Sequence, residues 1–195
     1  MSEEIKNITP EEENELQKEY IKKAKILFNS YASVVGHTPT ACVNTFGCQM
    51  NARDSEKLLG ILLEVGFIET EDENADFVIY NTCTVRDNAN TRVYGRLGTL
   101  GGMKKRNPNK IIALCGCMMQ EPSVIEKIKE SYRFVNLIFG THNIYKFSEL
   151  LCNVLESELN HKKGIIVDIW EDTDKIVENL PVKRKYSFKS SLTFE

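Results

Sequence analysis

Phe-Val-Ile-Tyr-Asn-Thr-Cys, at residues 77–83, is an apolar, strand-like run that ends on a cysteine. Two other stretches have the same form: Thr-Ala-Cys-Val-Asn-Thr-Phe-Gly-Cys at 40–48 and Ile-Ile-Ala-Leu-Cys-Gly-Cys at 111–117. Their terminal cysteines are 35 and 34 residues apart, roughly the length of one strand–helix–strand unit. Because successive strands of a parallel sheet end at the same edge, where ligands bind, we expect the three thiols to meet there.

The chain around these runs alternates between strand and helix patterns. Apolar runs bounded by turn residues predict strands, whereas apolar residues at three- and four-residue spacing predict helices. Strands are expected at 40–46, 76–82, 110–115, 135–139 and 165–169, and helices at 52–65, at 87–105, from 122 onward and at 143–155. This alternation predicts an α/β fold of the doubly wound (Rossmann- or flavodoxin-like) type, a mostly parallel sheet with helices on both faces.

The helix expected at 52–65 has clear end signals. Asn51 is expected to cap its start, with Asp54 reaching back in a weak capping box, and Gly66 suits its C-terminal stop. Its predicted buried stripe consists of Leu58, Leu59, Leu62 and Leu63.

Composition narrows the class of protein. Of 195 residues, 42% are hydrophobic, enough for a real core, and the net charge of −3 does not by itself indicate whether nucleic acid is a partner. No apolar stretch approaches the roughly 18 to 20 residues of a membrane span, and the acidic N-terminal sequence lacks a secretory h-region. We therefore expect a cytoplasmic protein without a membrane segment, whose six cysteines are reduced and available to metal.

The candidate metal ligands are Cys48, Cys83 and Cys117. Each precedes the start of an expected helix, where the backbone dipole favours the thiolate. Gly47 and Gly116 directly precede two of them and would permit a sharp turn or a close approach to a bulky group. The alternative is that all three are buried apolar thiols, which is a common role of cysteine.

The sequence favours an iron–sulfur cluster over zinc. A structural zinc site usually draws on CxxC pairs, and the chain has none. The three histidines lack metal-motif spacing and are expected at the surface: His37, His142 and His161. Thiolate-only ligation is typical of iron–sulfur clusters, and three cysteines on four irons would leave one iron open to an exogenous group.

The remaining cysteines have other expected roles. Cys42 lies within the first strand and Cys152 on an apolar helix stripe, so both are expected in the core. Cys115, two residues before Cys117, could share its face if the strand continued, which leaves it as a minor ligand candidate. A redox sensor using Cys115 and Cys117 is a further option.

Two other patterns leave their function open. Four glycines superficially suggest a phosphate loop, but they follow a helix and lack a Lys-Ser/Thr pair, so close helix packing is the better interpretation: Gly95, Gly98, Gly101 and Gly102. Two basic clusters could contact a phosphate backbone or form solvated surface. They comprise Arg86, Arg92, Arg96, Lys104, Lys105, Arg106 and Lys110, and then Lys183, Arg184, Lys185 and Lys189.

Three motifs together carry a specific resemblance. Thr-Phe-Gly-Cys48-Gln-Met-Asn-x-x-Asp-Ser-Glu, Asn-Thr-Cys83-x-Val-Arg and Cys-Gly-Cys117-Met-x-Gln resemble the radical SAM methylthiotransferases. The resemblance covers about residues 40–120. Within that family, Gln49-Met50-Asn51 and Thr84-Val85-Arg86 look like the MiaB branch, which modifies tRNA.

The resemblance implies that Cys48, Cys83 and Cys117 bind an auxiliary [4Fe–4S] cluster, with three cysteine ligands and one open iron. It also implies S-adenosylmethionine and a second [4Fe–4S] cluster, bound by CxxxCxxC in a following radical SAM domain. The implied reaction adds a methylthio group to a modified adenosine next to the anticodon, so tRNA is the implied partner. We expect the protein to be a monomer.

The resemblance also suggests how the chain is divided. We expect a helical acidic extension at 1–36, a methylthiotransferase domain at 37–170, and at 171–195 a linker and the start of a radical SAM domain. No CxxxCxxC motif is present, so the chain is expected to be truncated before that domain and inactive by itself. The competing hypothesis is a non-enzymatic α/β binding module with buried structural cysteines.

Overall fold

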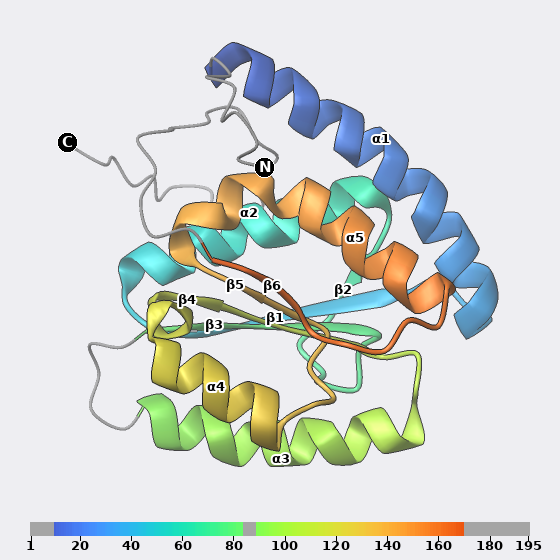
Figure 1. The fold of residues 1–195 in the computed structure, drawn as a ribbon. Helices are drawn as coiled ribbons and strands as arrows, with labels where there is room; N and C mark the ends of the chain where they lie inside the picture. Colours follow the sequence, from blue (N-terminus) through green and yellow to red (C-terminus); the bar gives the residue numbers. More distant parts are fainter. Residues whose placement is uncertain (1–9, 84–88, 170–195) are drawn as a thin grey trace, which may run out of the picture.

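A computed structural model of the chain describes residues 10–83 and 89–169, and its centre is a six-stranded parallel sheet (Figure 1). The strand order is β2-β1-β3-β4-β5-β6. The strands are β1 Thr40–Phe46, β2 Ile68–Glu69, β3 Phe77–Thr82, β4 Ile111–Gly116, β5 Leu137–Phe139 and β6 Ile166–Asp168. The chain leaves β1 for the β2 edge and then crosses to β3, so the winding reverses between β1 and β3. The predicted doubly wound fold is confirmed.

Helices cover both faces of the sheet. In Figure 1, α1, α2 and α5 lie on one side of it, and α3 and α4 on the other. The helices are α1 Pro10–Val35, α2 Gln49–Val65, α3 Ala89–Arg106, α4 Pro122–Ser131 and α5 Phe147–Leu159, with short 3-10 helices η1 Cys117–Gln120 and η2 Thr141–Lys146. No described helix is both long and apolar enough to cross a membrane.

The central strands send alternate side chains into two separate cores. Ile79 of β3 packs with α1, α2 and α5, whereas its neighbour Tyr80 packs with α3 and α4. Every residue of β3 and β4 is buried. Such continuous burial is typical of parallel strands covered on both faces, and it explains the unbroken apolar runs in the sequence.

Helix α1 is packed onto the sheet through α2 and α5. Ile21, Ala24, Phe28 and Tyr31 share one core with both helices. The Tyr31 hydroxyl also donates to the carbonyl of Asn109 over 2.8 Å, which ties α1 to the turn before β4. The sequence predicted a helical extension here, and the structure shows that this helix packs into the core.

Most predicted elements are found within a few residues of their expected bounds, with four differences. Helix α2 begins at Gln49 rather than 52, and the two-residue edge strand β2 was not predicted. The expected 143–155 helix begins as the 3-10 helix η2. In α2, Ile61 and Val65 are buried while Leu59 and Leu63 are only half-buried, so the buried stripe was predicted partly wrongly.

Candidate metal centre

The three candidate ligands follow three neighbouring strands. Cys48 comes after β1, Cys83 after β3 and Cys117 after β4, and these strands are adjacent in the sheet. Their register aligns the strand ends, because Phe46 pairs with Thr82, and Thr82 with Gly116. The connections from β1 to α2 and from β4 to α4 lie at the same edge (Figure 1). That edge includes the β1–β3 switch point, where doubly wound sheets bind their ligands.

Cys48 is the N-cap residue of α2, and its side chain is exposed. The backbone N–H of Asn51 is the largest influence that lowers the pKa of this thiol, although partial desolvation acts against it. The thiol of Cys83 also hydrogen-bonds to the Cys48 sulfur and acts in the lowering direction. Cys48 is therefore poised to ionise at an electropositive helix end, as expected from the sequence.

Asn51 does not cap α2 as predicted, because the helix begins three residues earlier, at Gln49 rather than 52. Because α2 begins at Gln49, Asn51 occupies the third helical position, and its side-chain oxygen accepts the Cys48 N–H over 3.2 Å. Cys48 and Asn51 thus form the capping box predicted for Asn51 and Asp54. A cysteine is not a usual cap residue, which is why the sequence pattern was misplaced.

Cys117 is half-buried at the end of β4, next to a backbone turn that requires glycine. Gly116 has a φ of 101°, and a Cβ there would lie 2.1 Å from the Thr82 carbonyl oxygen. The Cys117 thiol faces that same carbonyl at 3.9 Å. The predicted sharp turn at Gly116 is confirmed, and it places the Cys117 turn directly against the end of β3.

The three sulfurs are not equally close. Cys83 is 1% exposed and contacts Cys48. Among the described residues, no group of three His, Cys, Asp or Glu side chains has metal-binding geometry. The fold therefore brings Cys48 and Cys83 into contact and places Cys117 on the adjoining strand end. The ionisable Cys48 thiol and the Cys83 thiol in contact with it are donors that suit a soft, thiolate-bound metal.

A buried polar network that was not predicted from the sequence lies under the three cysteine turns. The Asn51 amide donates to Asn81 Oδ1 over 3.0 Å and to the Thr82 carbonyl over 3.3 Å. Asn81 returns bonds to the Asn51 carbonyl over 2.8 Å and to Ser55 Oγ over 3.1 Å. The available signal was Asn81-Thr82, two polar residues closing an otherwise apolar strand.

The other cysteines serve the core. Cys42 and Cys152 are buried, as predicted. Cys115 is fully buried on the α2–α5 side of the sheet, and burial raises its pKa well above the ordinary value for a thiol. Strand β4 ends before Cys117, so the two thiols are not carried onto one face, and this geometry favours neither ligation nor a redox pair by Cys115.

The expectations for the glycine and basic patterns are met only in part. Gly101 packs under Phe134, where a Cβ would lie 2.8 Å from the ring, but Gly95, Gly98 and Gly102 face open space, so close packing was wrong for those three. Lys110 is buried and donates to the Glu73 carbonyl over 2.6 Å.

Two further basic side chains make internal contacts: Arg96 is 3.0 Å from the Glu73 carboxylate, and Lys104 is 3.6 Å from Glu158. Lys105 and Arg106 remain exposed. Arg86, the side chain of Arg92 and the cluster at 183–189 lie outside the described residues. His37, His142 and His161 are exposed, as expected.

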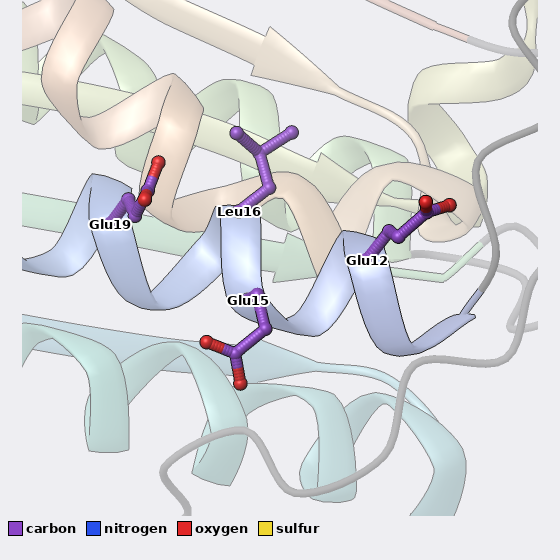
Figure 2. A pocket seen from close by; sticks show the side chains of 4 residues that line it. All are labelled: Glu12, Glu15, Leu16 and Glu19. Carbon is purple, nitrogen blue, oxygen red and sulfur yellow. The ribbon is translucent and has the colours of Figure 1, made fainter.

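A hollow on the surface of α1 contains none of the candidate cysteines among its lining residues. It is lined by Glu12, Glu15, Leu16 and Glu19, and Figure 2 shows Glu15 directed away from Glu12 and Glu19. Glu15 instead pairs with Lys18 at 2.8 Å. Carboxylates that diverge in this way do not make a metal site.

Comparison with known proteins places the chain in a family. Three relatives carry the name tRNA-2-methylthio-N(6)-dimethylallyladenosine synthase. The protein of Lachnoclostridium phytofermentans is 59% identical over 83% of this chain, that of Acetivibrio thermocellus 47% over 93%, and that of Alkaliphilus oremlandii 44% over 97%. The chain spans 34 to 38% of the length of these relatives. Residues 40–140, which include all three cysteine turns, match a family model, and the chain therefore belongs to uncharacterized protein family UPF0004.

Proposed function

We propose that this chain is the auxiliary-cluster domain of a tRNA methylthiotransferase. The observation that carries the proposal is the placement of three cysteines after β1, β3 and β4, at neighbouring strand ends beside the switch point. Ligands bind at such switch points, and thiolate-only donors favour an iron–sulfur cluster. The relatives named above supply the reaction class.

Cys48, Cys83 and Cys117 would hold a [4Fe–4S] cluster, whose fourth iron would accept the sulfur species to be transferred. The chain prepares this site by its own features. The start of α2 stabilises a thiolate at Cys48, and Gly116 seats the Cys117 turn against β3. Burial of Cys83 keeps water from one side of the site.

For the whole protein we propose the activity in the relatives' name. It would install a methylthio group on a modified adenosine next to the anticodon of tRNA, using S-adenosylmethionine and a second [4Fe–4S] cluster outside this chain. We further propose that it acts in the cytoplasm as a monomer. The division at residues 36 and 170 stays a prediction, and the linker at 171–195 lies outside the described residues.

Anaerobic reconstitution with iron and sulfide tests the cluster. We expect about four irons and four sulfides per chain, with a reduced-cluster EPR signal. The triple variant Cys48→Ala/Cys83→Ala/Cys117→Ala should lose both. The matched control, Cys42→Ala/Cys152→Ala, removes two buried thiols away from the site and should retain them. Equal uptake by the triple variant would refute the proposal.

The second candidate is an α/β binding module whose thiols are structural. It is favoured by one observation: the described side chains include no three-ligand metal group. Thiol titration of the folded, metal-free chain separates the two. Rapid reaction at Cys48, with protection of all three site thiols after reconstitution, supports the cluster domain, whereas no metal affinity supports the module.

A further inference from the structure

One side chain links the turns of two candidate ligands. Asn51 Oδ1 accepts the Cys48 N–H and also the Cys48 thiol, each over 3.2 Å. At its other end, Asn51 Nδ2 donates to the Thr82 carbonyl over 3.3 Å, and Cys117 Sγ faces that same oxygen at 3.9 Å. The side-chain amide of Asn51 therefore connects the Cys48 turn to the Thr82 carbonyl, against which Cys117 lies.

The side-chain amide of Asn51 is buried, and its oxygen and nitrogen are both hydrogen-bonded. Asn51 is 2% exposed and Asn81, its main partner, is 0% exposed. Both protons of Asn51 Nδ2 have acceptors, Asn81 Oδ1 and the Thr82 carbonyl. Burying amides is costly unless every polar atom is paired, and a paired network fixes one geometry. This network thus fixes the position of the start of α2 relative to the end of β3.

Two glycines make room for the network. A Cβ at Gly47 would lie 2.3 Å from Asn51 Oδ1, so any larger residue would displace the amide. A Cβ at Gly116 would lie 2.6 Å from Asn81 Oδ1 as well as against Thr82. The glycines before Cys48 and Cys117 therefore serve the same pair of asparagines.

We propose that Asn51 is the positioning residue of the cysteine site. Its amide sets the separation between the Cys48 turn and the Thr82 carbonyl against which Cys117 lies. The inference rests on the proposed cluster, and no part of it requires Asn51 to touch that cluster. Residues behind metal ligands commonly act this way, and their loss costs about 10- to 100-fold in metal affinity.

Asn51→Ala removes the amide, and Gly47→Ala displaces it without removing it. Both variants should weaken cluster retention against a chelator by at least about tenfold and shift the midpoint potential and EPR signal of the remaining cluster. The double variant should retain the cluster no better than Asn51→Ala, because the methyl group added at Gly47 would still lie 2.8 Å from the Cβ at position 51. A purely structural role would lower the unfolding midpoint but leave the potential and spectrum unchanged.

Two controls match these changes. Asn44→Ala removes another asparagine, which lies in β1 and bonds to Glu73 at 2.9 Å instead. Gly98→Ala adds a methyl group into open space on α3. Both should keep the wild-type potential and spectrum. If Asn51→Ala fails to fold, the potential and spectrum of Gly47→Ala test the proposal.

A measurement without iron separates this inference from the proposed function. Phenylarsine oxide bridges neighbouring thiols, so metal-free wild-type chain should capture it and both Asn51→Ala and Gly47→Ala should capture it at least about tenfold more weakly. A wild-type chain that captures the arsenical but takes up no iron overturns the cluster, not the positioning role. Equal capture, potential and spectrum in all variants overturns the positioning role.

Discussion

At the scale of single residues, a few individual side chains and one glycine determine the properties of the sheet edge that carries the cysteines. Gly116 lacks the Cβ that would collide with Thr82, and the exposed Cys48 lies where a helix start lowers its pKa. Asp54, which lies six residues after Cys48 in α2, is buried, and desolvation raises its pKa to about 6. Each feature can be changed by one substitution.

Gly116→Ala should destabilise the fold by at least about 2 kcal/mol. The cost combines a φ of 101°, which alanine avoids, with a methyl group 2.1 Å from the Thr82 carbonyl oxygen. Urea unfolding followed by circular dichroism measures it. Gly98→Ala is the matched control and should be neutral or stabilising by up to about 1 kcal/mol. Similar midpoints for the two variants would contradict the geometry at Gly116.

Asp54 should make stability fall as pH rises from about 4 to about 6. In the unfolded chain the carboxyl ionises near its ordinary pKa of 3.8, whereas in the folded chain it keeps its proton up to about 6. The folded state binds the extra proton in this window, so its advantage shrinks as pH rises, by at most about 3 kcal/mol above the upper pKa. Asn does not ionise, so Asp54→Asn should lack this decline.

Urea midpoints of the wild type and Asp54→Asn at pH 4 and pH 7 measure the effect. We expect the difference between the two proteins to move in favour of Asp54→Asn at pH 7. A constant difference across this range would mean that the carboxyl ionises alike in both states.

At the scale of elements, α1 is part of the core rather than a loose appendage. Phe28 contacts Phe67 edge-on with ring centroids 4.9 Å apart, and a Cβ at Gly66 would lie 2.8 Å from the Phe28 ring. The C-cap of α2 and the helix α1 are thus fitted to one another. The sequence predicted a helical extension, but it did not show which helices this extension would contact.

Phe28→Ala should cost about 3 kcal/mol of stability, because the lost ring leaves a cavity between α1 and the end of α2. The matched control is Ile26→Ala on the same helix, where the side chain is 69% exposed and the change should stay within about 0.5 kcal/mol. Guanidinium unfolding of both variants measures the difference. Equal effects would show that α1 does not pack as described.

At the scale of the whole molecule, the cysteines are carried by the most protected part of the sheet. Strands β3 and β4 are buried throughout, whereas both residues of the edge strand β2 are exposed and those of β6 are half-buried. The candidate site at the ends of these central strands therefore rests on a rigid support.

Native-state hydrogen exchange should follow this order. Amides of β3 and β4 should exchange only through global unfolding, and those of β2 and β6 through local opening with a smaller free energy. Exchange rates measured by mass spectrometry or NMR as urea is added test it. Faster exchange in β3 than in β6 would contradict the described packing.

The sequence by itself determined the order of five strands and of the helices between them, the α/β class, the core positions of Cys42 and Cys152, and the three cysteines as a candidate set. These follow from local periodicity, since apolar runs ending in turn residues need no partner to be recognised. Only the tertiary structure decided that β2 pairs at the edge, that Cys48 caps α2, and that Lys104 and Lys110 make internal contacts. It also revealed the Asn51–Asn81 pair. Each of these depends on which distant segments meet, and a polar residue at the end of an apolar run does not show in the sequence which partner will satisfy it.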